Sequence, residues 1–223
     1  EEFVLNPMIF RQEWEELEEM GIAPKVYADE NCLITTPFDM ILNQIKEKWR
    51  GGERHGSCGI GIYETKIRTL YNFEVGIWKQ LSKDELIDYL KKIRDEYFMY
   101  TIDFVGSKVP EDWLNIVNSE NLINVFAEDM MFMLSRMLFK PEKEIFSEYD
   151  FLIFENGQGL LLDQNNKEYF PHLTPSNTGL KNPLKIISNM HCNPDVEVCY
   201  VTRTYLTRHG AGRLDGECDK QEI

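Results

Sequence analysis

Three segments of this sequence bring glycine together with hydroxyl, amide or basic side chains, and the first is the most compact. Residues 56–61 read GSCGIG and precede the run Tyr63-Glu64-Thr65-Lys66. Glycine lets backbone amides come close to a ligand, and a serine hydroxyl adds a further donor, which is how proteins cradle phosphate groups. A tight structural turn has the same composition, so the pattern leaves both interpretations open.

The second segment, residues 154–163, reads FENGQGLLLD and follows a hydrophobic run that we expect to be a strand. Gln158 would then lie at the carboxyl edge of that strand, where open α/β sheets bind ligands, and its amide offers a donor and an acceptor to a base edge. A hydroxyl-rich loop, PHLTPSNTG at 171–179, comes next. Such a loop binds phosphate at a helix N-terminus or merely caps the helix, and capping alone is the commoner case.

The third segment, residues 205–213, reads YLTRHGAGR. Arg208 offers a planar fork of donors for phosphate or carboxylate, and the neighbouring glycines leave room beside it. His209, taken alone, is more often a structural histidine than a functional one.

The helices that would position these segments are indicated by caps and apolar stripes. A helix is predicted after Asn6-Pro7, with Phe10, Trp14 and Leu17 on one face, and another after Thr36-Pro37. Ser82 with Glu85 forms a capping box for a third helix, and Ser119 is expected to cap a fourth. The stripe of that fourth helix, which we interpret as core rather than as a groove for a partner, consists of Leu122, Phe126, Met130, Met133 and Met137.

Strands are predicted at residues 59–63, 151–154 and 196–201, each a short apolar or alternating run beside turn residues. Helices interleaved with short buried strands indicate an α/β layer architecture. The 223 residues suit one domain, or part of one, and no linker-like segment marks a boundary.

Composition excludes several classes of protein. A formal charge of −14 would repel a phosphate backbone, so nucleic acid is not expected as a partner. No apolar stretch is long enough to suggest a membrane span, and the first residues do not look like a signal peptide, so we expect a cytoplasmic protein. The five cysteines are scattered and never form a CxxC pair, which argues against a disulfide framework or a metal site.

Taken together, the three segments resemble the adenylosuccinate synthetase family in order and spacing. That family has a Gly/Thr-rich loop ending in GIG before a Tyr-Glu-x-Lys run, an FE(G)xQGxLLD strand end, a Thr-x-Ser-Asn-Thr loop and a Thr-Arg-x-Gly-x-Gly turn. The stretch NPMIFRQEWEELEEMGI also resembles the SPxxLxxExxxLxxxGI helix of the family. The resemblance implies that residues 1–223 are the central portion of one domain with the P-loop NTPase-like fold of the family, a mixed or parallel sheet with flanking helices.

The resemblance also implies a reaction, in which GTP phosphorylates the purine O6 of IMP with Mg²⁺ assistance and the amine of L-aspartate displaces that phosphate. The purine nucleoside monophosphate would be read at its base by Gln158 and the backbone of Leu162. Its phosphate would be held by Thr174 and by the loop of Gly56, Ser57, Cys58 and Gly59. Arg208 and His209 would lie near the ribose, and Arg68 corresponds to an arginine that reaches across a homodimer interface to the partner's phosphate.

Departures from the family pattern set limits on this expectation. The GDEGKGK loop, the general-acid histidine segment and the guanine site have no counterpart here, so the catalytic residues and the site for GTP or ATP and Mg²⁺ stay unassigned, and we expect these residues alone to be inactive. Two alternatives remain open. One is the phage-type branch that uses dGMP, to which HGSCGIG and His209 point, and the other is a non-catalytic module that binds purine monophosphates.

Overall fold

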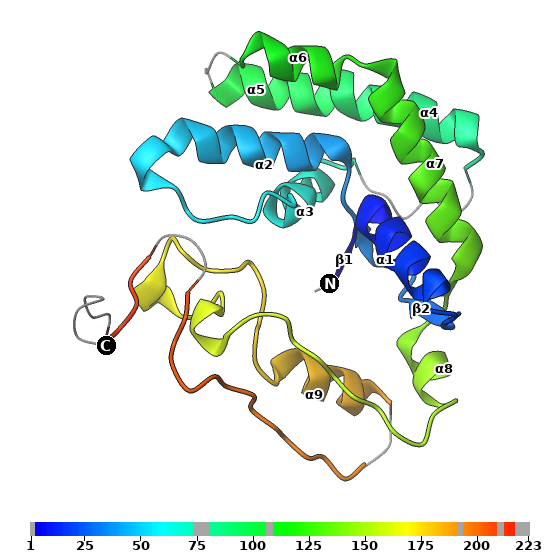
Figure 1. The fold of residues 1–223 in the computed structure, drawn as a ribbon, viewed down its shortest axis with the longest axis vertical. Coiled ribbons are helices and arrows are strands. Elements are labelled where there is room, and N and C mark those ends of the chain that lie inside the picture. Colours follow the sequence, from blue (N-terminus) through cyan, green and yellow to red (C-terminus); the bar gives the residue numbers. More distant parts are fainter. Residues whose placement is uncertain (1–2, 74–80, 106–108, 191–193, 209–211, 217–223) are drawn as a thin grey trace.

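The computed structural model describes residues 3–73, 81–105, 109–190, 194–208 and 212–216. Figure 1 shows a helical half, which holds the N-terminus, above a second half that is mostly loops and contains α9. The first half runs β1 (Val4–Leu5), α1 (Pro7–Glu19), β2 (Val26–Ala28), β3 (Leu33–Ile34), α2 (Pro37–Arg50), η1 (Gly51–Glu53), α3 (Ile62–Leu70), α4 (Lys83–Lys92), η3 (Ile93–Phe98), α5 (Met99–Val105), α6 (Glu111–Val117), α7 (Glu120–Arg136) and β4 (Met137–Phe139). The second contains α8 (Glu142–Phe146), η4 (Leu160–Leu162), η5 (Lys167–Tyr169) and α9 (Lys181–Asn189).

The strands of the described residues form two short parallel pairs. Strand β1 pairs with β3, with Val4 opposite Leu33, and β2 pairs with β4, with Val26 opposite Met137. The chain between two paired strands runs through helices, as parallel pairing requires. The expected class, α/β with parallel strands and flanking helices, is confirmed.

The predicted helices form, and most begin at the predicted caps. The Asn6 side chain accepts hydrogen bonds from the amides of Met8 and Ile9 at 3.1 and 3.3 Å. Capping boxes close the starts of α2, between Thr36 and Asp39, and of α4, between Ser82 and Glu85. Ser119 does precede α7, but its side chain makes no capping hydrogen bond, so that part of the prediction is wrong.

The three predicted strands are absent from the described residues. Residues 59–61 turn through positive φ at Gly59 and Gly61, and α3 then begins at Ile62, because these glycines adopt a backbone that a strand cannot use. Residues 151–154 and 196–201 are extended but form no ladder, and the side chain of Ile153 is 96% exposed. An apolar run becomes a strand only beside another strand, and no described segment pairs with these two.

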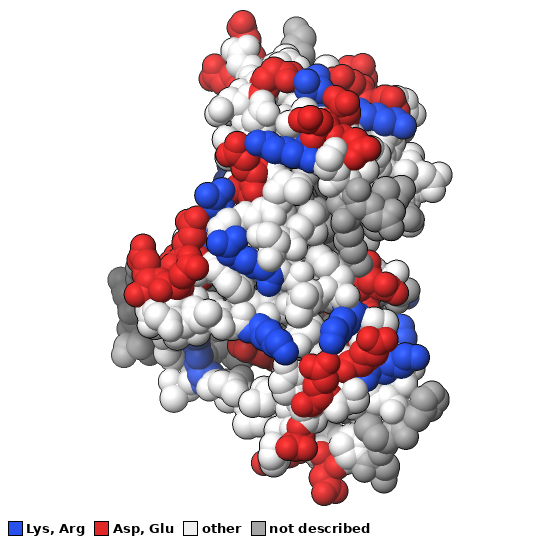
Figure 2. Space-filling model, turned by 90° about the vertical axis from the view of Figure 1, so that its right-hand side faces the viewer, with Lys and Arg blue, Asp and Glu red and all other residues white. Residues whose placement is uncertain are grey.

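The core lies between α2, α4, η3 and α7. It includes Phe38 and Leu42 from α2, Leu90 from α4 and Met130 from α7, all of them nearly inaccessible to solvent. Met133 and Met137 are buried as well, which confirms the interpretation of the methionine stripe as core, although Met137 begins β4 and does not extend the helix. No helix in the described part of the chain is both long and apolar enough to span a membrane. On the face drawn in Figure 2, acidic and basic side chains are interspersed around an uncharged area.

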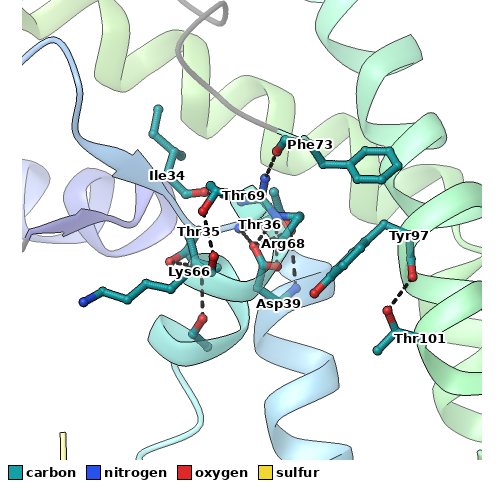
Figure 3. Close-up of polar contacts among 12 residues, drawn as sticks. Ile34, Thr35, Thr36, Asp39, Lys66, Arg68, Thr69, Phe73, Tyr97 and Thr101 are labelled. Atoms are coloured by element: carbon teal, nitrogen blue, oxygen red, sulfur yellow. Dashed lines mark hydrogen bonds and ion pairs between the residues drawn. The ribbon is translucent and has the colours of Figure 1, made fainter. Parts of the chain in front are cut away.

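A fully buried ion pair joins α2 to α3 (Figure 3). The Nε atom of Arg68 lies 3.0 Å from both carboxylate oxygens of Asp39, and its Nη1 and Nη2 atoms donate to the backbone oxygens of Phe73 and Ile34 at 2.6 and 2.7 Å. One carboxylate oxygen of Asp39 also accepts from the amide and hydroxyl of Thr36. Burial and the nearby Asp39 charge raise the pKa of the Tyr97 hydroxyl, so it stays neutral beside the pair.

We expect Arg68→Met to lower the free energy of unfolding by about 3–5 kcal/mol, because it leaves the carboxylate of Asp39 buried without its counter-charge. Denaturant unfolding measures this change. Lys83→Met, which removes the exposed pair of Lys83 with Glu128, is the control and should leave the transition where it is. Equal effects of the two substitutions would contradict the structural role of the buried pair.

Candidate functional site

The candidate site is organised by the polar stripe of α2. One face of the helix, away from the apolar stripe that enters the core, carries polar side chains at helical spacing: Asp39, Asn43, Lys46, Glu47 and Arg50. Each of these side chains contacts a neighbouring residue of α2 or a residue in the segment 56–68. The helix therefore positions the glycine-rich loop and the start of α3.

The glycine-rich loop wraps around the carboxylate of Glu47. The amides of Gly56 and Ser57 both donate to Glu47 Oε2, at 3.0 and 3.3 Å, and the Ser57 hydroxyl donates to Asn43 Oδ1 at 2.7 Å. Burial alone would raise the pKa of Glu47, but hydrogen bonds from Arg50 and from the two loop amides lower it overall. The loop thus holds an anion, as its composition indicates, and that anion is a side chain of the protein.

A shallow pocket of about 410 Å³ opens beside this loop. It is lined by Gln44, Glu47, Lys48, Arg54, Ser57, Cys58 and Gly59. In the part of the chain that the structure describes, neither Lys48 nor Arg54 has a carboxylate within ion-pair distance. Two cations and the loop donors therefore face the same open space.

Behind the loop, Glu64 of α3 forms a second, more deeply buried ion pair. Its side chain is 2% exposed, Lys46 Nζ lies 3.4 Å from its Oε1 atom, and its Oε2 atom has no hydrogen-bond partner among the described residues. Burial raises the pKa of this carboxyl, and the charge of Lys46 offsets the rise only in part. The Tyr-Glu-x-Lys run thus supplies a buried carboxyl group rather than a surface one.

The segment 156–179 folds into a compact hydrogen-bonded loop. Asn156 donates to the backbone oxygens of Thr178 and Gly179, and the amide of Thr178 donates to Asp163 at 2.8 Å. Hydrogen bonds from the backbone amides of Asn165 and Thr178 lower the pKa of Asp163. The loop residues around position 178 therefore serve to fold this segment, in addition to any role toward a ligand.

Within this loop, Leu162 and Thr174 are neighbours, because the amide of Thr174 donates to the backbone oxygen of Leu162 at 2.9 Å. Gln158 is exposed at a bend that follows extended chain, so its predicted place at the carboxyl edge of a strand is wrong. Its side chain remains accessible to a ligand.

The structure brings the three predicted segments together (Figure 1). His172 Nδ1 lies 3.1 Å from the backbone oxygen of His55, and Arg208 Nη2 donates to the backbone oxygen of His172 at 2.8 Å. Since a carbonyl only accepts, Nδ1 of His172 must carry the proton. Lys66 adds a contact with the backbone oxygen of Pro175. His172 therefore links the glycine loop to Arg208, while His209 lies outside the described residues.

Arg68 lies apart from this meeting point, fully buried against Asp39. In this structure its guanidinium donates to acceptors of the same chain, so a contact with a partner's phosphate would require it to leave them. Its role across a subunit interface stays a prediction.

Sequence reasoning missed His55, His172, Asn43 and Glu47. The sequence does contain a signal for Asn43 and Glu47. They lie four residues apart, so they share one face of a helix whose other face is apolar, and the glycine loop follows that helix. No local pattern marks the two histidines, which are separated by 117 residues and meet only in the fold.

The family model for adenylosuccinate synthetase matches residues 1–223 of this chain. The match covers the glycine loop, the segment 156–179 and Arg208 alike, which are the segments that the fold brings together. The chain belongs to the adenylosuccinate synthetase family. Membership places it among ligases of purine biosynthesis.

Within the described residues, no group of three His, Cys, Asp or Glu side chains is arranged to hold a metal ion. The sequence also lacks a GDEGKGK-like loop of the kind that other adenylosuccinate synthetases use for nucleotide. The described residues therefore do not fit a centre for GTP and Mg²⁺.

Gly61 provides a test of how the loop enters α3. Its φ is +81°, and an added Cβ would lie 2.7–2.8 Å from backbone atoms of Asp39 and Met40. Gly61→Ala should therefore be more destabilising, by roughly 2 kcal/mol or more, than Gly21→Ala, which also has positive φ but open space around it. Thermal unfolding of both variants gives the comparison, and similar losses would show that the close approach to α2 is unimportant.

A second prediction concerns the pH dependence of stability. Burial, and then the charge of Arg50, lowers the pKa of His55. A histidine with a lowered pKa stabilises the folded state above its unfolded pKa of about 6.5, and this contribution is lost as the pH falls through the lower folded value. His55→Asn should therefore flatten the decline of unfolding free energy between about pH 7 and 5. Parallel pH profiles of variant and native protein would contradict this.

Proposed function

We propose that this chain holds the purine nucleoside monophosphate in a ligase that joins L-aspartate to IMP at the expense of GTP. The observation that supports the proposal is the convergence of the glycine loop, the segment 156–179 and Arg208 around His172. Family membership indicates the class of reaction, and the convergence supports the proposal that the nucleotide substrate binds there.

In this proposal the charged end of the nucleotide lies at the glycine loop. Lys48 and Arg54 supply positive charge in the pocket, and the loop supplies backbone and hydroxyl donors at Ser57. Thr174 adds a hydroxyl from the neighbouring segment. Phosphoryl transfer demands mainly positioning and charge stabilisation from a protein, and these residues would supply the positioning of the acceptor substrate.

The base of the nucleotide would be recognised from the segment 156–179. Gln158 is exposed and carries both a donor and an acceptor, and the backbone of Leu162 lies within the same folded loop. Arg208 would lie near the ribose, since it is fixed to the backbone of His172. GTP and Mg²⁺ would be bound through residues other than those assigned here, and the homodimer and a cytoplasmic location remain part of the proposal.

We expect Gln158→Ala to weaken binding of IMP by about tenfold or more while the melting temperature stays unchanged. The loss follows from two hydrogen bonds to the base, and the unchanged stability follows from the exposure of Gln158. Calorimetry with IMP measures the affinity, and dGMP titrated in parallel compares the two candidate bases.

Gln164→Ala is the matched control, because Gln164 is an exposed glutamine of the same loop whose described contact is made by its backbone. It should bind IMP as the native protein does. Equal affinity of Gln158→Ala and the native protein would remove Gln158 from the site. Equal affinity of the native protein for IMP and ribose 5-phosphate would remove base recognition altogether.

A further inference from the structure

Four donors of the glycine loop, the amides of Gly56, Ser57 and Gly59 and the hydroxyl of Ser57, already have acceptors within the protein. Gly56 and Ser57 direct their amides at one oxygen of Glu47, the Ser57 hydroxyl donates to Asn43, and the amide of Gly59 donates to Ser57 Oγ at 3.3 Å. A phosphate that used the first two amides would have to take the place of the Glu47 carboxylate.

We propose that Glu47 is an internal competitor for the substrate phosphate, and that phosphate binding exchanges the carboxylate for the phosphate at the amides of Gly56 and Ser57. The inference rests on the proposed function and deepens it, since it names the residue that sets the affinity of the phosphate site.

The geometry around Glu47 allows such an exchange. Its two carboxylate oxygens have separate partners, because Oε2 accepts from the loop amides and Oε1 pairs with Arg50. The carboxylate can leave the amides and keep its ion pair with Arg50, so its negative charge still has a counter-charge after the exchange. Arg50 lies on the same helix three residues away and is partly exposed, which leaves room for the side chain to turn.

The electrostatics of the pocket favour the incoming anion. Lys48 and Arg54 line the same space as Glu47 and Ser57. A phosphate group carries close to two negative charges and three acceptor oxygens, whereas the carboxylate carries one charge. The phosphate would therefore gain contacts with these cations that Glu47 does not make.

Such a competitor has a defined consequence for affinity. The site binds phosphate only in the fraction of molecules in which Glu47 has left the loop, so the apparent dissociation constant rises by the inverse of that fraction. Charge-assisted hydrogen bonds are roughly twice as strong as neutral ones, so replacing the carboxylate by an amide should weaken the internal contact without changing the shape of the side chain.

The test titrates inorganic phosphate and, separately, IMP into the native protein and into Glu47→Gln. We expect both ligands to bind about tenfold more tightly to the variant. Glu47→Asp, which keeps the charge but shortens the reach to the loop, should also bind more tightly. The matched control is Glu53→Gln, which removes the same charge from an exposed side chain of η1 and should leave the affinity unchanged.

Amide resonances provide a second readout that does not depend on activity. Addition of phosphate should shift the backbone amide signals of Gly56 and Ser57 in a saturable manner, and in Glu47→Gln the shift should saturate at a lower concentration. Unchanged or weaker phosphate binding in Glu47→Gln, an equal gain in Glu53→Gln, or no shift of these two amides would each overturn the inference. If phosphate binds more tightly to Glu47→Gln but IMP binds no better than ribose 5-phosphate, the exchange at Glu47 stands and the proposed function fails.

Discussion

The buried pair of Asp39 and Arg68 is the interaction on which the arrangement of the helical half depends. A single carboxylate closes the capping box of α2 with Thr36 and neutralises a guanidinium that also binds backbone oxygens of β3 and of the chain after α3. Isolated charges at this depth would cost several kcal/mol each, so the pair is stable only if every partner is in place. The start of α2, the end of β3 and α3 are therefore fixed relative to one another as one unit.

Helix α2 connects this buried ion pair to the candidate site. Its apolar stripe is buried in the core through Phe38, Leu42 and Ile45, while its polar stripe holds the glycine loop through Asn43 and Glu47. Because one rigid helix serves both surfaces, the loop donors are positioned by the packing of the core rather than by the loop itself. Sites built on rigid elements in this way hold their geometry more closely than sites built on loops alone.

The sequence predicts the helices well because helix signals are local. A cap lies next to the start of the helix that it determines, as at Asn6, Thr36 and Ser82. The methionine stripe likewise lies within the helix whose buried face it marks. The strands fail for the opposite reason, since residues 151–154 are apolar enough for a strand but need a neighbour that their own composition cannot specify. At the site, the glycine loop and the segment 156–179 are recognisable by composition and family pattern. Their union through His55 and His172 is a long-range contact that only the fold reveals.

The two halves of the candidate site differ in how firmly they are held. The glycine loop is attached to α2 and thereby to the core. Among the described residues, the segment 156–179 meets the loop and α3 through polar contacts of His172 and Lys66 with backbone oxygens and through the ring contact of His172 with His55. Polar contacts at a partly exposed surface contribute little net free energy, because water competes for the same donors and acceptors. The second half is thus the part whose position a ligand can influence most. A nucleotide that touches Ser57 with its phosphate and Gln158 with its base would bridge the halves, and its binding energy would add to that of the contacts that join them.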